Sequence, residues 1–174
     1  MKTLLMIVET GTLNQPKLRS EDIPMSSQSV KEAMEAGKRL KIREIKPDLI
    51  ISENTETAIE TASYLAEELD LPRSVVEVDE YIHRAEADEL VEILRGISPD
   101  SNTVLLCGQQ TSFTELANQL AGEEMEELEP GAIACIELKI NSWKELDERT
   151  GHVSFVIDPD DEPPASHSQD FLSA

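Results

Sequence analysis

Three segments place polar side chains directly after short apolar runs, and these side chains have the most scope for chemistry. They are Val8–Thr10, Ser52–Asn54 and Cys107–Gln109. Glu9 is the acid that follows the first run, Leu4–Val8. In open α/β folds, ligands bind just beyond the carboxyl ends of the strands. The sequence therefore predicts that the three segments meet at one edge of a sheet and form a site.

The elements that must position these residues alternate between strands and helices. Strands are predicted at Thr3–Val8, Asp48–Ser52, Val75–Val78, Thr103–Cys107, Gly131–Ile140 and His152–Ile157. Capping-box spacing predicts helices from Ser29 and Ser112. A further helix is predicted from Thr57 and a short one from Ser142. Apolar residues at helical spacing predict four inner helix faces: Val30, Ala33, Met34, Gly37 and Leu40; Ala58, Ala62, Leu65, Ala66 and Leu69; Ala87, Leu90, Val91 and Leu94; Phe113, Leu116, Ala117, Leu120 and Ala121.

This alternation predicts a single α/β domain over residues 1–157, built as a three-layer αβα sandwich with a mainly parallel sheet. A chain of 174 residues is long enough to bury such a core. Residues 158–174 are rich in Pro, Asp and Ser and show no periodicity. We expect this segment to be a disordered acidic tail.

The composition restricts the partners and the compartment. The chain has 36 acidic and 15 basic residues, a net charge of −21, which repels nucleic acid and anionic membranes, so neither is expected as a partner. The run Thr3–Val8 is too short for a signal-peptide core, and no run is long enough to span a bilayer, so we expect a cytoplasmic protein. Cys107 and Cys135 each lie inside a predicted strand, which favours buried, reduced thiols over a zinc site.

Several segments also follow the order and spacing of one known family. Leu4–Ile7 with Val8–Thr10 lies where that family carries an Arg-His-Gly or Arg-His-Ala signature. The other similar segments are Asn14–Pro16 and Glu21–Ser26 (a first loop), Lys46–Ser52 (a KPDLIISS strand), Tyr81–Ala85 with Asp88–Leu90 and Ile93–Leu94 (LYHA…DELLEIL), and Leu105–Gln109 with Leu116–Asn118 (LLVGH…LAN). Together they resemble the histidine phosphatase superfamily, in particular its SixA-like phosphohistidine phosphatase branch. The resemblance covers residues 1–157 and implies a phosphoglycerate mutase-like fold.

The same resemblance implies a phosphatase site whose catalytic positions are replaced in this chain. In active members a His at the end of the first strand is phosphorylated, and two arginines and a second His surround the phosphoryl group. The first Arg position holds Val8, the nucleophile position holds Glu9, the second Arg position holds Thr57, and the second His position holds Gln109. The implied pocket is lined by Glu9, Thr10, Asn14, Ile23, Glu53, Thr57, His83, Gly108, Gln109 and Gln110, with Ile23 at a further Arg position.

Phosphoryl transfer depends on positioning and on cationic stabilisation of the transferred group. The loss of these cations and the gain of an acid at Glu9 predict a catalytically inactive pseudo-phosphatase with a binding or regulatory role. We expect it to need no cofactor and to bind a protein partner or a small molecule. The alternative is an active phosphatase or hydrolase of phosphorylated protein or small-molecule substrates, with a rearranged site.

Several candidate residues have two interpretations. The acids Glu9, Glu53, Glu56 and Glu60 could hold a hard cation such as Mg²⁺, but the simpler interpretation places the last three on an exposed helix start. His83 either borders the implied pocket or is an ordinary loop residue. Four hydroxyl side chains could donate hydrogen bonds into the pocket; they are Thr10, Thr12, Thr111 and Ser112. Thr111 and Ser112 could equally be ordinary helix caps.

Overall fold

Six strands form one sheet in the order β3–β2–β4–β1–β5–β6. The computed structural model describes residues 1–9, 27–108 and 111–159. The strands are β1 Lys2–Val8, β2 Leu49–Glu53, β3 Val76–Asp79, β4 Thr103–Gly108, β5 Ile133–Leu138 and β6 Gly151–Ile157. The first four are parallel to one another, β5 runs antiparallel to β1, and β6 runs antiparallel to β5. The predicted mainly parallel sheet is confirmed.

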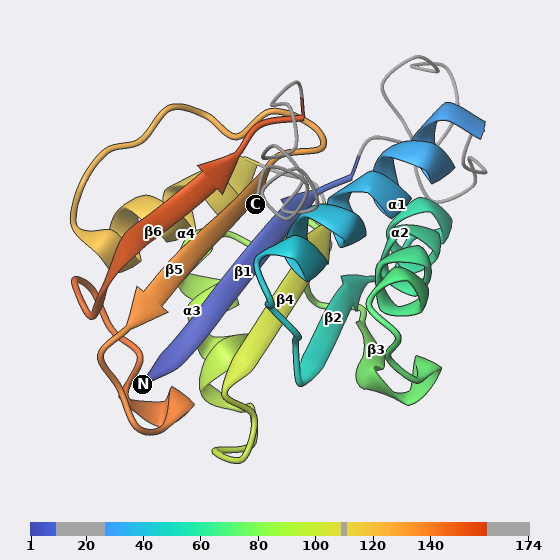
Figure 1. The fold of residues 1–174 in the computed structure, drawn as a ribbon. Helices are drawn as coiled ribbons and strands as arrows, with labels where there is room; N and C mark the ends of the chain where they lie inside the picture. Colours follow the sequence, from blue (N-terminus) through green and yellow to red (C-terminus); the bar gives the residue numbers. More distant parts are fainter. Residues whose placement is uncertain (10–26, 109–110, 160–174) are drawn as a thin grey trace, which may run out of the picture.

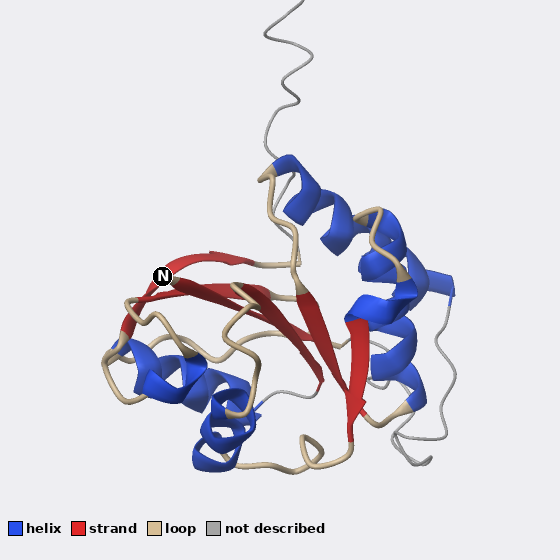
Figure 2. Ribbon diagram, turned by 90° about the horizontal axis from the view of Figure 1, so that it is seen from below, coloured by secondary structure: helices blue, strands red, loops and turns tan. Residues whose placement is uncertain are grey.

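Two helices cover each face of the sheet. Helices α1 Ser27–Ile42 and α2 Glu56–Glu68 lie on one face, and α3 Ala87–Arg95 and α4 Thr111–Ala121 lie on the other (Figures 1 and 2). Two short 3₁₀ turns, η2 Arg73–Val75 and η3 Trp143–Glu145, complete the described elements. The three-layer αβα sandwich is therefore confirmed. No helix in the described part of the chain has the length and apolar content needed to cross a membrane.

The central strand β1 divides the core into two clusters. Leu5 and Ile7 pack on the side of α1 and α2, with Leu40 and Leu65 of those helices. The alternate residues of the strand, Val8 among them, pack on the side of α3 and α4. Burying each such aliphatic side chain contributes about 1.5–3 kcal/mol. A strand that is apolar on both faces is thus explained by its place in the middle of the sandwich.

One predicted core residue is wrong. Met34 is 37% exposed, because the inner face of α1 is formed instead by Ala33, Ala36 and Leu40. Gly37 lies on the same inner side, where a Cβ would come within 2.7 Å of the Cβ of Glu68 in α2. Small residues thus let the two helices approach closely, and the larger methionine lies outside the contact.

The other inner faces agree with the sequence, and the boundaries differ by a few residues. Helix α1 begins at Ser27, two residues before Ser29, and β5 is shorter than the predicted Gly131–Ile140. The short helix predicted from Ser142 is a 3₁₀ turn, and Ser142 closes a capping box at its start. Residues 14–26 of the predicted first loop and residues 160–174 of the predicted tail lie outside the described residues.

Candidate functional site

The ends of β2, β4 and β1 lie side by side, as the sequence predicts. Val8 pairs with Gly108 across β1 and β4, and Ser52 pairs with Cys107 across β2 and β4. The Glu9 backbone N–H extends the ladder, donating to the carbonyl oxygen of Gly108 at 3.0 Å. The carboxyl ends of three parallel strands therefore bring Glu9 and Glu53 to the same edge of the sheet.

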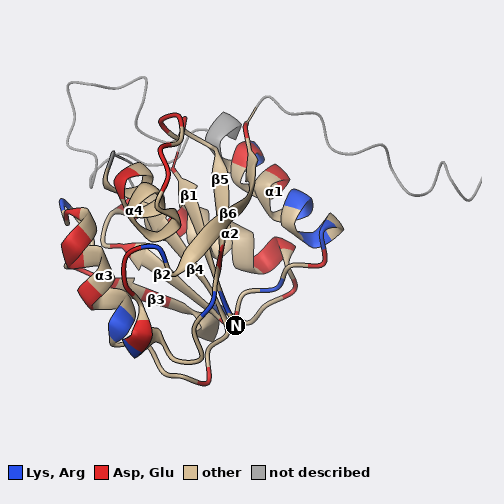
Figure 3. Ribbon diagram, turned by 90° about the vertical axis from the view of Figure 1, so that its left-hand side faces the viewer, with Lys and Arg blue, Asp and Glu red and all other residues tan. Residues whose placement is uncertain are grey.

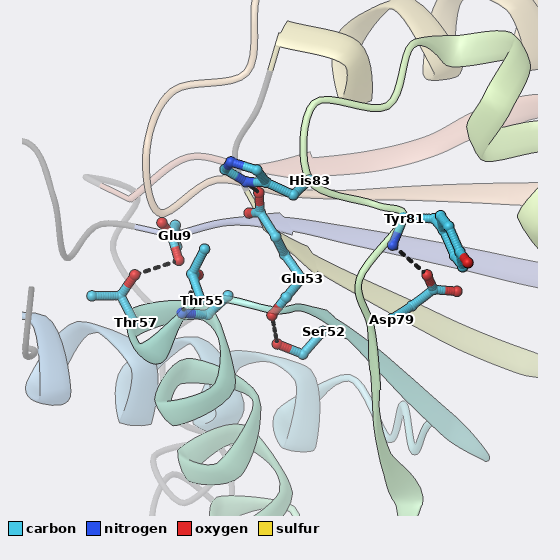
Figure 4. Close-up of polar contacts among 9 residues, drawn as sticks. Glu9, Ser52, Glu53, Thr55, Thr57, Asp79, Tyr81 and His83 are labelled. Carbon is cyan, nitrogen blue, oxygen red and sulfur yellow. Dashed lines mark hydrogen bonds and ion pairs between the residues drawn. The ribbon is translucent and has the colours of Figure 1, made fainter. Parts of the chain in front are cut away.

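Glu9 is held inside the protein rather than in solvent. Its residue is 3% exposed, and its Oε2 accepts a hydrogen bond from the Thr57 hydroxyl at 2.9 Å (Figure 4). Thr57 lies in the first turn of α2, and its own carbonyl accepts a hydrogen bond from the Thr61 hydroxyl at 2.8 Å. Thr55 caps that helix by accepting from the Ala58 N–H at 3.2 Å. The cap fixes the start of α2 and so directs the Thr57 hydroxyl toward the end of β1.

Val8 is a core residue. Its side chain belongs to the cluster on the α3 and α4 side of the sheet. Its N–H donates to the Ala132 carbonyl at 3.2 Å, and its carbonyl accepts from the Gly131 N–H at 2.7 Å. Successive residues of an extended chain point to opposite faces of the sheet. Val8 therefore lies on the α3 and α4 side, and the Glu9 side chain lies on the α2 side, where it meets Thr57.

Glu53 corrects the expectation of an exposed helix start. It is the last residue of β2 and is 2% exposed, whereas α2 begins three residues later at Glu56. Glu53 pairs with Asp79 in the β2–β3 ladder, so β2 extends one residue beyond the predicted strand. The Glu53 carboxylate is therefore buried at the end of the strand. Of the two other acids, Glu56 is exposed and Glu60 is half-buried.

His83 is the partner of Glu53. Its Nδ1 lies against Glu53 Oε1 as a close ion pair or hydrogen bond, and the imidazole is partly exposed (Figure 4). The two residues are separated by 30 positions in the chain, and no spacing rule in the sequence relates them. His83 thus lies beside Glu53 at the end of β2.

Gly108 leaves space for the Glu53 carboxylate. A Cβ added at Gly108 would lie 3.0 Å from Glu53 Oε2 and 3.4 Å from the Cζ atom of Phe113. The two acids thus flank the end of β4, with Glu9 bonded to the Gly108 backbone and Glu53 lying over its Cα. A side chain at this position would press on the Glu53 carboxylate.

The Cys107 thiol lies beneath this edge of the sheet and is affected by both acids. Cys107 is fully buried and donates to the Ala58 carbonyl at 3.5 Å. Burial raises the pKa of this thiol well above its ordinary value, and the negative charges of Glu9 and Glu53 raise it further. Both carboxylates therefore act on the same point, and the field at the strand ends disfavours an additional negative charge.

A small cavity of about 30 Å³ lies beside Glu9, between β1 and α1. It is lined by Ala36, Arg39 and Thr61 among others, and reaches Pro159. The Arg39 guanidinium donates to the carbonyls of Asp158 and Pro159, at 2.9 and 3.2 Å. We did not identify Arg39 or Thr61 from the sequence. Arg39 follows Ala36 by three residues on α1, and this spacing is the sequence feature that places the two side chains on the same side of the helix.

Glu9, Glu53, Glu56 and Glu60 do not form a metal-binding cluster. In residues 1–9, 27–108 and 111–159, no three His, Cys, Asp or Glu side chains are arranged to hold a metal ion. Glu9 and Glu53 are each engaged with another side chain, Thr57 and His83 respectively.

Half of the predicted pocket residues belong to the described structure. Glu9, Glu53, Thr57, His83 and Gly108 come together at the strand ends. The remaining predicted residues lie outside the described residues; they are Thr10, Asn14, Ile23, Gln109 and Gln110, together with Thr12. Ser112 lies within α4, immediately after Thr111.

The chain has the phosphoglycerate mutase-like α/β fold, which several solved structures share. A structure with the provisional name phosphohistidine phosphatase SixA, from Nakamurella multipartitia, matches with a TM-score of 0.74 at 15% identity, over 94% of this chain and 97% of its own. The protein histidine phosphatase SixA in complex with tungstate matches with a TM-score of 0.74 at 17% identity, over 90% and 97%. A mycobacterial glucosyl-3-phosphoglycerate phosphatase matches with a TM-score of 0.64 at 15% identity, over 88% and 97%.

No family model and no curated protein matches the sequence. The likeness is thus one of fold, and it confirms the phosphoglycerate mutase-like fold that the resemblance implies.

Proposed function

We propose that this protein is a SixA-like phosphohistidine phosphatase homologue that lacks the family's catalysis and acts by binding, in a regulatory role. One observation carries the proposal: Glu9 and Thr57, which occupy the implied nucleophile and second arginine positions, are bonded to each other inside the protein. Groups that would grip a phosphoryl oxygen are replaced by a carboxylate and a hydroxyl that satisfy one another.

Charge gives the physical reason. Two unit charges about 4 Å apart interact by about 4 kcal/mol at an effective dielectric near 20. A cation at the end of β1 would contribute this energy as attraction to a phosphoryl oxygen, whereas the Glu9 carboxylate contributes it as repulsion. Glu53 adds a second buried acid at the same edge. The proposal therefore includes weak binding, or none, of phosphate and its tetrahedral analogues.

A second candidate function is an active phosphatase or hydrolase with a rearranged site. It is favoured by the Glu53–His83 pair, because a carboxylate that holds one imidazole nitrogen leaves the other free to accept a proton. In this case His83 would replace the implied histidines as the group that moves protons.

The partner is proposed to be a protein or a small molecule, without nucleic acid or membrane, since the chain carries a net charge of −21. The free thiols Cys107 and Cys135, both buried, are compatible with the reducing cytoplasm as the place of action.

Activity measurements separate the two functions. The purified protein is incubated with p-nitrophenyl phosphate and with a phosphohistidine-bearing protein, and tungstate binding is measured by calorimetry. We expect turnover equal to the blank and no saturable tungstate binding. Turnover that disappears in His83→Ala would establish the rearranged hydrolase. Turnover that disappears in Glu9→Ala but survives in His83→Ala would also overturn the proposal and would place the chemistry on Glu9.

A further inference from the structure

A second surface lies away from the strand ends, along the outermost strand of the sheet. Strand β3 pairs with β2 on one side, and within the described ranges no strand pairs with its other side (Figure 1). An edge strand presents backbone N–H and C=O groups that another extended chain can join.

A groove of about 530 Å³ runs beside this strand. Its apolar wall is formed by residues of β2, α3 and the turn that follows α3; they are Leu49, Ile51, Ile93 and Ile97. Glu77 is paired in register with Ile51, so its side chain lies on the α3 side of the sheet, above this wall. We call β3 and this cavity together the β3 groove.

The polar lining of the β3 groove is acidic. It includes the carboxylates of Asp48, Glu77 and Asp79, and its described lining contains no Lys or Arg. Asp48 is fixed, because its Oδ2 accepts from the Asn102 and Thr103 N–H groups at 2.8 and 2.9 Å. Helix α3, which contributes Ile93 to the groove, also carries three acids against one base (Figure 3); they are Asp88, Glu89, Glu92 and, as the base, Arg95.

Exposed apolar side chains lie on and just after the strand. Val78 is 48% exposed and Tyr81 is 72% exposed, and the Tyr81 N–H is bonded to Asp79 Oδ1 at 2.8 Å. Charged residues on an edge strand protect it against pairing with copies of itself. The same charges favour a partner segment of opposite sign, and exposed aromatic and β-branched side chains supply contact area.

We propose that the β3 groove docks an extended, basic segment of a partner protein, which adds to β3 as a further strand. Lysine or arginine side chains of the segment lie against Glu77 and Asp79 on the α3 face of the sheet, and the alternate apolar side chains lie beside Val78 on the opposite face. This surface is separate from the strand-end site, so the inference goes beyond the proposed function and does not depend on whether that site is catalytic.

The test uses the whole protein and a labelled synthetic peptide of about eight alternating valines and lysines, a typical strand length, in about 0.15 M salt. We expect saturable binding by fluorescence anisotropy. The double variant Glu77→Gln with Asp79→Asn should weaken it at least about tenfold. The matched control, Glu123→Gln with Glu124→Gln, removes the same charge from the surface after α4 and should change binding less than about twofold. Circular dichroism checks that each variant is folded.

Three outcomes would overturn the proposal. Absence of saturable binding by the wild type removes it directly. Equal weakening in the two charge variants means that the peptide is attracted to the acidic protein as a whole. Concentration-dependent dimers in sedimentation, abolished by Val78→Lys, mean that a second copy of this chain covers β3 instead.

Strand addition itself has a separate test. A peptide of the same sequence with alternate backbone nitrogens methylated keeps its charge but cannot complete a ladder of hydrogen bonds. We expect it to bind at least about tenfold more weakly. Unchanged affinity would contradict strand addition.

Discussion

At the residue scale, the site is decided by which side chains satisfy each other. Glu9 and Glu53 are both acids at strand ends, and both are buried with a partner: a hydroxyl for the first and an imidazole for the second. A buried carboxylate without a partner is costly, so each partner stabilises the fold as well as defining the pocket. The Thr57 hydroxyl thus occupies a hydrogen-bonding direction of Glu9 that a ligand would otherwise use.

Replacing Thr57 by valine removes this hydroxyl while nearly keeping the shape of the side chain. We expect the free energy of unfolding to fall by about 1–3 kcal/mol, because a buried acceptor loses a hydrogen bond. Urea denaturation measures the change. Thr150→Val is the matched control, since it removes a hydroxyl bond to the Asp147 carbonyl at an exposed turn and should cost about 0.5 kcal/mol or less. Equal stability of Thr57→Val and wild type would mean that the bond to Glu9 is not formed in solution.

The two cysteines should be unreactive in the folded protein. Burial raises the pKa of the Cys107 thiol well above its ordinary value and that of Cys135 to about 11. Since the thiolate is the reactive form, Ellman's reagent at about pH 8 should modify neither thiol in the native state. Both should react once guanidinium unfolds the chain. Rapid modification without denaturant would show that one of the strands opens.

The same shifts predict the direction of the pH dependence at alkaline pH. The folded state holds the Cys135 proton up to a pKa of about 11, against an ordinary value of 9.0. Between these values the unfolded state binds fewer protons than the folded state, so the free energy of unfolding decreases as the pH rises. Denaturation curves from about pH 8 upward measure this slope. Cys135→Ala should have a smaller slope above pH 9.0, and an unchanged slope would assign the effect to other groups.

At the scale of elements, the site depends on how closely three strands and one helix approach. Strand β4 ends in a glycine because the Glu53 side chain of β2 lies over it. Helix α2 starts at a Thr55 cap, and this start directs Thr57 to the end of β1. Close packing of these elements, rather than any one of them, brings the Glu9–Thr57 and Glu53–His83 pairs to the same edge.

Replacing Gly108 by alanine tests that packing. The added methyl lies 3.0 Å from Glu53 Oε2, so the carboxylate or the strand must move, and we expect a loss of about 1–3 kcal/mol in stability. The chemical shift of the His83 imidazole should change as Glu53 moves. Gly96→Ala is the control, because its methyl meets only the Ile93 carbonyl at 3.4 Å, and it should change stability by less than about 1 kcal/mol. A stable Gly108→Ala with an unaltered His83 signal would contradict the contact.

At the scale of the whole molecule, charge is the main property that composition controls. A net charge of −21 makes the folded chain repel itself, and salt reduces this repulsion. The screening length falls from about 30 Å at about 0.01 M salt to about 8 Å at about 0.15 M.

We therefore expect the melting temperature to rise when sodium chloride is increased over this range. Differential scanning calorimetry measures it. A variant with Glu123, Glu124 and Glu126 changed to glutamine should respond less, because it repels itself less. A melting temperature that falls with salt would mean that attractive ion pairs, such as Lys41–Asp70, outweigh the net repulsion.

The sequence by itself determined the layers and the meeting point of the strands. Apolar runs such as Leu4–Val8 and helical spacings such as Ala58, Ala62 and Leu65 depend only on near neighbours in the chain, and periodicity records them. The same patterns wrongly predicted that Met34 is buried. The close approach of α1 and α2 at Gly37 leaves this side chain outside the contact. The resemblance indicated which positions had changed, among them Glu9 and Thr57.

Only the tertiary structure decided how those positions are used. The Thr57 hydroxyl reaches Glu9 across 48 residues, and His83 reaches Glu53 across 30, and no local rule encodes either pairing. Burial of Glu53 likewise depends on where β2 ends and on a glycine in the neighbouring strand. Such contacts are set by the packing of distant elements, because a side chain finds its partner in space and not along the chain.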